Sequence, residues 1–126
     1  MSGTNRQVLL LDLVDDAAAI ARYEAWHRAG QVPAAVIAAI RAADIRAMEI
    51  WRRADRLVMI METGPAFDSL AKAVNDAASP DIMAWEALMD TMQRRLPGTG
   101  AAEKWAGASR IFSLDDDDDD GGCAGG

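Results

Sequence analysis

The stretch "DIRAMEIWRRADRLVMIMET" (residues 44–63) contains two apolar-rich runs joined by a short polar segment. "DIRAMEIW" and "RLVMIMET" have the composition typical of β-strands, and "RRAD" between them has that of a turn. The pattern predicts two neighbouring antiparallel strands. Alternation along the first run places Met48 and Ile50 on one face of the sheet, and Ile45, Glu49 and Trp51 on the other.

The residues before this pair predict one more strand and two helices. The apolar run Gln7–Val14 is a candidate buried strand. Asp15 or Asp16 can then cap a helix over Ala17–Arg28, because a carboxylate accepts hydrogen bonds from the free amides of the first turn. "AGQVP" interrupts this helix, and Pro33, at a first-turn position, starts a second helix that runs to about Ala43.

After the pair, Gly64-Pro65 and Ser79-Pro80 break the chain into further helical segments. "AFDSLAKAVNDAA" predicts one helix, and Asp81–Arg95 carries apolar residues at helical spacing. "SRIFSL" (residues 109–114) predicts a last short strand.

This order of elements indicates an α+β fold of the ferredoxin-like βαββαβ type. Its antiparallel four-stranded sheet carries the helices on one face. The bare face of such a sheet needs a cover, and a second copy of the chain is the usual one. The sequence therefore predicts a homodimer, in the form of a dimeric α+β barrel.

One folded domain is expected over residues 1–114. The chain has 126 residues, enough for a single core, and 51% hydrophobic residues, too many for a disordered protein. The remainder, "DDDDDDGGCAGG" (residues 115–126), joins like charges to glycines and predicts a disordered acidic tail. Its six aspartates carry most of the formal net charge of −7, so the folded part is nearly neutral.

Several classes of partner and chemistry lack support in the sequence. A nearly neutral body offers no basic surface for nucleic acid. No apolar run approaches the ~20 residues of a membrane span, and the polar start "MSGTNRQ" is unlike a secretory signal, so we expect a cytoplasmic protein. The single Cys123 lies in the tail, which excludes a Cys-based metal site. Motifs for nucleotide phosphates, zinc and serine nucleophiles are absent as well.

The segment "YEAWHRAG" (residues 23–30) contains the only tyrosine and the only histidine of the chain. On a helix, Tyr23 and His27 lie on one face at positions i and i+4, and Trp26 lies on an adjoining stripe. One interpretation is structural: the rings pack on the sheet, and His27 is hydrogen-bonded at its edge. The other is chemical, because a phenol beside an imidazole can transfer protons and imidazole titrates near neutral pH.

Five segments resemble the L-rhamnose mutarotase family, which includes members that act on L-fucose. They are "YEAWHRAG", "IRAMEIWR", "RLVMIMET", "MAWEALM" and "EKWAGASRIFSL", and the resemblance covers residues 7–114. It implies a ferredoxin-like domain that dimerises through its sheets. It also implies an isomerase that interconverts the α and β pyranose anomers of a 6-deoxy-L-hexose, through the open-chain aldehyde and with neither metal nor cofactor.

The resemblance assigns roles to three residues. The family's acid/base histidine matches His27, its sugar-contacting tyrosine matches Tyr23, and a tryptophan of the late helix matches Trp85. An indole face suits the apolar side of a deoxysugar, although core packing is the alternative interpretation for Trp85. The chain departs from the family pattern at Met48, where some members have a second sugar-contacting tyrosine, and at Ala84, where some have a further tryptophan.

Two other functions fit the same architecture. A small cofactor-free monooxygenase could use a histidine and a tryptophan against a large aromatic substrate. A non-catalytic dimeric module could bind a ligand or a partner. A small cavity lined by hydroxyl-binding groups would favour the sugar, whereas a buried His27 with both ring nitrogens satisfied and no adjacent cavity would favour the non-catalytic module.

Overall fold

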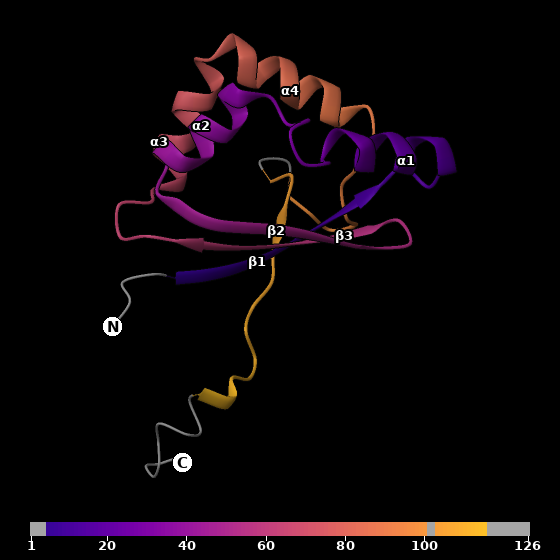
Figure 1. Cartoon of the computed structure of the whole chain (residues 1–126). Coiled ribbons are helices and arrows are strands. Elements are labelled where there is room, and N and C mark those ends of the chain that lie inside the picture. The colour runs from indigo at the N-terminus through magenta and orange to yellow at the C-terminus, as the bar shows by residue number, and fades with distance from the viewer. Residues whose placement is uncertain (1–4, 101–102, 116–126) are drawn as a thin grey trace.

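The chain folds into an antiparallel sheet with four helices on one of its faces (Figure 1). The computed structural model describes residues 5–100 and 103–115. In chain order the elements are β1 (Asn5–Leu13), α1 (Ala17–Trp26), α2 (Ala34–Ala42), β2 (Ile45–Arg53), β3 (Arg56–Thr63), α3 (Ser69–Ala77), α4 (Pro80–Asp90), β4 (Gln93–Arg94) and β5 (Ala106–Gly107). None of the helices in the described part of the chain is long and apolar enough to cross a membrane.

The hairpin of β2 and β3 forms as the sequence predicts, and β1 lies beside it. The strands follow one another in the sheet in the order β2-β3-β1-β4, and β5 also pairs with β1. β1 and β3 pair along their length, from Asn5 opposite Thr63 to Asp12 opposite Arg56. β1 is therefore the strand that joins the hairpin to the C-terminal part of the chain.

Side-chain caps explain where three of the helices begin. The Asp16 carboxylate accepts a hydrogen bond from the Ala19 amide at 2.9 Å, which confirms one of the two predicted caps of α1. Asp68 caps α3 through the amides of Leu70 and Ala71, and Ser79 caps α4. The sequence predicted Pro33 within the first turn of α2. The structure places it directly before the helix.

The predicted helix Asp81–Arg95 is too long. α4 ends at Asp90, and Gln93–Arg94 instead forms β4, which pairs with β1 opposite Leu13 and Asp12. Met92, between the two elements, is almost fully buried, and its carbonyl accepts a hydrogen bond from the Val14 amide. Burial of Met92 against β1 thus outweighs continued helical pairing.

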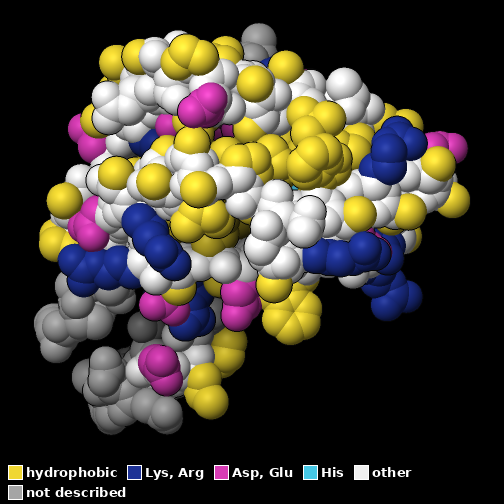
Figure 2. All heavy atoms as spheres, turned by 45° about the horizontal axis from the view of Figure 1, so that its top comes forward, with side chains coloured by type: hydrophobic (Ala, Val, Ile, Leu, Met, Phe, Trp, Pro, Cys, Tyr) yellow, Lys and Arg dark blue, Asp and Glu magenta, His cyan; other side chains and the backbone are white. Residues whose placement is uncertain are grey.

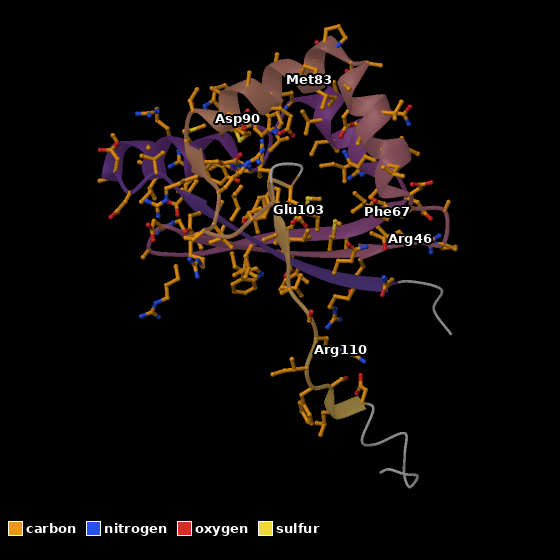
Figure 3. The ribbon with its side chains drawn as sticks, turned by 180° about the vertical axis from the view of Figure 1, so that it is seen from behind. Arg46, Phe67, Met83, Asp90, Glu103 and Arg110 are labelled. Carbon is orange, nitrogen blue, oxygen red and sulfur yellow. The ribbon has the colours of Figure 1, made fainter. Side chains whose placement is uncertain are left out.

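The prediction of a last strand at "SRIFSL" is also wrong. The place beside β1 is taken by β5, and the sheet has five strands, not four. Backbone pairing ends with the Ala108 amide, which donates to the Val8 carbonyl. Residues 109–114 then leave the sheet on the side away from the helices, past Arg110 (Figure 3). Ile111 on this segment is 96% exposed, and Phe112 and Leu114 are exposed as well.

β2 contains a β-bulge, which the predicted alternation of its side chains did not include. The register shifts between Ile45 and Ala47, because one extra residue is inserted in β2 at this point. Ile45 consequently lines the same helix-side cavity as Met48 and Ile50 and is buried. The expectation that Ile45 shares a face with Glu49 and Trp51 is therefore wrong.

The core lies between the sheet, α1 and α4. Six buried residues form one cluster there: Leu13, Ala19, Tyr23, Leu57, Met89 and Met92. Trp85 and Trp105 pack against this cluster from its partly buried edge. The residue expected to bind substrate, Tyr23, is thus held by the central packing of the protein.

The opposite face of the sheet is covered by none of the described helices (Figure 1). Cross-strand pairing places Trp51, Val58 and Leu10 in one row on this face, and Glu49, Ile60 and Val8 in the next. Trp51 is 61% exposed. These rows make a surface of mostly apolar side chains, which we call the open face.

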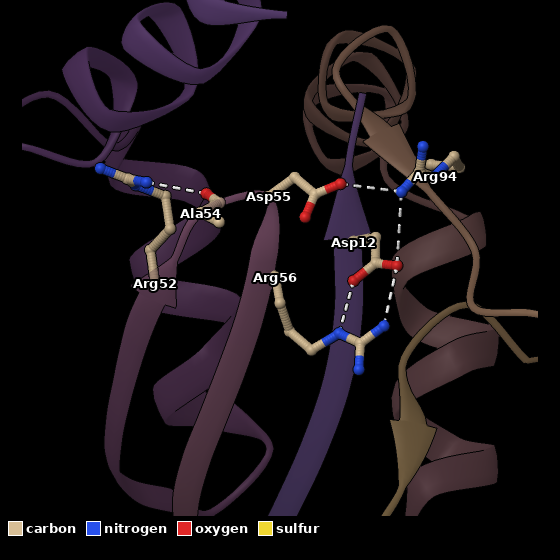
Figure 4. Close-up of polar contacts among 6 residues, drawn as sticks. All are labelled: Asp12, Arg52, Ala54, Asp55, Arg56 and Arg94. Atoms are coloured by element: carbon tan, nitrogen blue, oxygen red, sulfur yellow. Dashed lines mark hydrogen bonds and ion pairs between the residues drawn. The ribbon is translucent and has the colours of Figure 1, made fainter. Parts of the chain in front are cut away.

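A charged cluster joins β1, β3 and β4 at one end of the sheet (Figure 4). The buried Asp12 carboxylate accepts hydrogen bonds from the Arg56 guanidinium at 2.7 and 3.2 Å and forms an ion pair with Arg94 at 3.6 Å. Arg94 in turn pairs with Asp55 at 2.9 Å. The hydrogen bonds from Arg56 hold the pKa of the Asp12 carboxyl below its usual value.

We expect Asp12→Asn to lower the free energy of unfolding at neutral pH by about 1–3 kcal/mol, because charge-assisted hydrogen bonds are lost at a buried position. The pKa of Asp12 is depressed in the folded state, so its contribution is present above the unfolded pKa of about 4 and disappears as the pH falls through the folded value. Urea unfolding at one protein concentration measures both effects. The exposed Asp15→Asn is the control, and an equal loss in the two variants would contradict the assignment.

The predicted domain boundary at residue 114 stays a prediction. Residues 116–126, nearly all of the predicted tail, lie outside the described residues.

Candidate active site

A cavity of about 470 Å³ lies between the helical layer and the sheet. Its wall includes residues from all four helices and from β1, β2 and β3. Seen from the helix side, hydrophobic side chains gather between the helices at the centre of the molecule, with charged side chains around them (Figure 2). The volume is within the ~300–1,000 Å³ typical of small-molecule sites.

The three residues singled out in the sequence meet at this cavity. Tyr23, His27 and Trp85 all line it. The ring centroids of Tyr23 and His27 are 4.2 Å apart, and those of His27 and Trp85 are 5.6 Å apart in an edge-to-face arrangement. The ring centroids of Trp26 and Trp85 are 6.0 Å apart, also edge-to-face. Trp85 of α4 thus adds a third ring to the i, i+4 pair of Tyr23 and His27.

The end of α1 fixes the tautomer of His27. His27 follows the last residue of α1, and its Nδ1 lies 2.7 Å from the carbonyl oxygen of Tyr23. Because a carbonyl only accepts hydrogen bonds, Nδ1 carries the hydrogen, and Nε2 of the neutral ring has the free lone pair. The His27 amide itself donates to the Glu24 carbonyl and not to that of Tyr23, as happens where a helix ends. The backbone therefore orients the ring and leaves Nε2 for chemistry.

Tyr23 presents a protonated hydroxyl. Its side chain is 3% exposed, and burial raises the pKa of Tyr23 to about 12, with a smaller contribution from the negative charge of Glu86. Gln93 Nε2 donates to the hydroxyl oxygen at 3.4 Å. The phenol can therefore donate its own hydrogen to an oxygen in the cavity, but it is a poor base at neutral pH.

Absorbance can report this ionisation directly, because Tyr23 is the only tyrosine. At a pH of about 10.5, more than half of the tyrosine should be ionised in the unfolded chain, since its pKa there is about 10. In the folded protein only a few per cent should be ionised, because the pKa is about 12. The buried neutral phenol stabilises the fold below the unfolded pKa, and this contribution is lost as the pH rises towards 12. Equal titration at 295 nm with and without denaturant would contradict the burial of the hydroxyl.

Other polar residues of the cavity were not identified from the sequence. Glu86 and Gln93 line it close to Tyr23, and Lys72 and Asp76 line it from α3. Lys72 and Asp76 form an ion pair at 2.5 Å, and Lys104 bridges Glu86 and Asp90 at 2.6 and 2.7 Å. Glu86 directly follows Trp85, and this neighbour is the only feature of the sequence that could have indicated a place for Glu86 in the site.

The rest of the wall is apolar. Met48, which the resemblance matched to a second tyrosine of some family members, lines the cavity together with Ile50, Met59 and Phe67. The site therefore combines one polar cluster around Tyr23 and His27 with a largely hydrophobic wall. A small molecule with hydroxyl groups on one side and apolar carbons on the other would suit both parts.

Comparisons with known proteins agree with this arrangement. The family model for L-rhamnose mutarotase matches residues 6–114. An L-fucose mutarotase of Xanthomonas campestris pv. campestris is 50% identical over 111 residues, which cover 88% of this chain and 89% of the relative. The crystal structure of an L-rhamnose mutarotase from Formosa agariphila matches with a TM-score of 0.62 at 12% identity, over 87% of this chain and 98% of that one, and supports the fold. The first two matches each extend over most of the folded part, and by them the chain belongs to the L-rhamnose mutarotase family.

Proposed function

We propose that this protein interconverts the α and β pyranose anomers of a 6-deoxy-L-hexose, and that L-fucose is its preferred substrate. The pairing of Tyr23 and His27 in the wall of a cavity, with Trp85 against the histidine ring, carries the proposal. The choice of sugar is supported by the 50% identical relative, which is named L-fucose mutarotase. L-Rhamnose is the alternative substrate, because the family is named for it.

The proposed mechanism moves two protons. Ring opening removes the proton from the anomeric hydroxyl O1 and delivers a proton to the ring oxygen O5, as the C1–O5 bond breaks and C1=O1 forms. Rotation about the C1–C2 bond and closure by the reverse steps give the other anomer. His27 Nε2 takes the proton from O1, and the imidazolium supplies one to O5.

Tyr23 and Trp85 bind the sugar in this mechanism. The neutral phenol of Tyr23 donates a hydrogen bond to a sugar oxygen. The indole of Trp85 and the side chains of Met48 and Ile50 cover the apolar side of the ring, including its methyl group. A 6-deoxy sugar suits such a wall better than a sugar with a hydroxyl on C6, because that hydroxyl would lose its hydrogen bonds to water.

Saturation-transfer NMR on the anomeric signals tests the function. The wild-type protein should transfer saturation between the α and β signals of L-fucose faster than the uncatalysed exchange, and faster than it does for L-rhamnose. An uncatalysed rate for both sugars would overturn the mutarotase proposal. A faster rate for L-rhamnose would overturn only the choice of substrate.

We also propose that the protein is a homodimer that packs through the open face. The apolar rows of Trp51, Val58 and Leu10 support this, because a second copy would remove them from water. Residues 109–114 leave the sheet on the same side with Ile111 and Phe112 exposed, where they would reach a partner (Figure 3). The cytoplasmic location and the absence of a nucleic-acid partner stay predictions.

Analytical ultracentrifugation at micromolar concentration tests the dimer. The wild-type chain should sediment as a dimer, and Trp51→Glu should shift it towards monomer, because it replaces an exposed indole of the open face with a charge that a partner would have to bury. Leu70→Glu is the matched control, since Leu70 is an exposed apolar residue of α3 on the helix side. A wild-type monomer, or equal effects of the two variants, would contradict the proposal.

A further inference from the structure

Gln93 occupies an unusual position in the cavity. It belongs to β4, where it pairs with Leu13, and its side chain lines the cavity beside Tyr23. Nε2 donates to the Tyr23 hydroxyl at 3.4 Å. Oε1 is buried and has no hydrogen-bond partner among the described residues. One end of the amide is therefore engaged with the protein, and the other end is not.

A buried amide oxygen without a partner is unfavourable, because it has lost its hydrogen bonds to water. Rotation of the amide does not remove the problem, since Tyr23 offers a single hydroxyl and can satisfy only one end of the side chain. The charged side chains of the cavity differ in this respect: Glu86 is paired with Lys104, and Lys72 with Asp76. Among the buried side-chain nitrogen and oxygen atoms of the described residues, Gln93 Oε1 alone has no hydrogen-bond partner.

The backbone around Gln93 is held firmly. Met92 is almost fully buried, and its carbonyl accepts a hydrogen bond from the Val14 amide. β4 pairs with β1, the strand that also carries the core residue Leu13. A side chain on such a backbone reaches the cavity from a fixed position, as a specific contact requires.

We propose that Gln93 binds the substrate directly: a small rotation of its side chain exposes the buried Oε1 to the cavity, where it accepts a hydrogen bond from a ring hydroxyl of the sugar on C2, C3 or C4. The inference rests on the proposed function, because the hydroxyl belongs to the sugar. Gln93 Nε2 meanwhile donates to the Tyr23 hydroxyl, which donates to a sugar oxygen. The amide and the phenol then form one connected set of hydrogen bonds that both donates to the sugar and accepts from it, and each bond strengthens the next. Such a set distinguishes sugars by the position of their hydroxyl groups.

Binding measurements with L-fucose and its 2-deoxy, 3-deoxy and 4-deoxy analogues test this contact. Gln93→Met keeps the length of the side chain and removes its hydrogen bonds. We expect it to weaken L-fucose binding about three- to tenfold, the range for one hydrogen bond. The analogue that lacks the contacted hydroxyl should bind equally well to the variant and to the wild type. This equality also shows that the variant is folded, because a loosened fold would weaken every sugar. Gln31→Met, at an exposed residue that does not line the cavity, should change none of the affinities.

Two results would overturn the inference. One is unchanged L-fucose binding in Gln93→Met, and the other is a loss of affinity for all four sugars by the same factor. Failure of the proposed function looks different: the wild-type protein would bind sugars without accelerating anomer exchange, and the binding comparison would still report on Gln93.

Discussion

Replacing His27 with alanine is expected to slow the exchange of L-fucose anomers by ~10²–10⁴-fold at neutral pH, the usual loss for a general acid/base. The reason is specific to the geometry: Nδ1 is committed to the Tyr23 carbonyl, so Nε2 is the ring nitrogen that exchanges protons with the sugar. The fold should persist, because His27 is half-buried at the edge of a cavity and lies outside the central cluster.

Tyr23→Phe is the matched comparison for this prediction. It keeps the ring that packs in the core and removes only the hydroxyl, so the loss should be about tenfold, the size expected for one hydrogen bond to a substrate. Exchange-rate NMR on both variants, with circular dichroism as the check on folding, separates the two roles. Full wild-type exchange in His27→Ala would refute the assigned proton transfer. A larger loss in Tyr23→Phe than in His27→Ala would instead make the phenol the principal proton donor.

Local chemistry explains why the first half of the fold could be predicted. The cap at Asp16 and the polar turn before Arg56 each act over a few residues, and the structure confirms both. The i, i+4 spacing of Tyr23 and His27 also acts locally, and it brought the two rings together at the cavity. The exact end of α1 was missed, and that end orients His27.

The C-terminal third depends on contacts that are distant in sequence. Gln93–Arg94 forms a strand because it lies beside β1, some eighty residues earlier in the chain, and local helical spacing gives no sign of this. The same holds for Ala106–Gly107, which took the place predicted for residues 109–114. Because Gln93 was placed on a helix, its side chain could not be recognised as part of the cavity. A residue of the cavity wall was thus missed because the fold was predicted wrongly at this point.

The bulge in β2 also made the prediction wrong, but for one residue only. A single inserted residue between Ile45 and Ala47 turned Ile45 towards the helices. Period-two alternation cannot reveal such an insertion, because each half of the strand still alternates. Met48 and Ile50 lie beyond the bulge, and their predicted common face is confirmed by the cavity that both line.

A second large effect is expected from Leu57→Ala, which should lower the free energy of unfolding by about 3–5 kcal/mol, as for other buried leucines. Leu57 is 1% exposed and packs in the cluster of Tyr23, Leu13, Met89 and Met92. Alanine would leave a cavity that two strands of a sheet cannot close, because the backbone pairing of β3 with β1 fixes their spacing. For a domain of this size the loss is a large share of the total stability, which is about 5–15 kcal/mol.

Leu70→Ala makes the same chemical change at a leucine of α3 that is 77% exposed, and it should alter stability by less than about 0.5 kcal/mol. Urea unfolding of both variants at one protein concentration gives the comparison, since association would otherwise change the apparent stability. Tyr23 packs in the same cluster as Leu57, so Leu57→Ala should also loosen the packing around the phenol. The titration of Tyr23 at 295 nm should then come closer to that of the unfolded chain. A loss below about 1 kcal/mol for Leu57→Ala would mean that its surroundings collapse to fill the space, and that the packing which holds Tyr23 is softer than the structure implies.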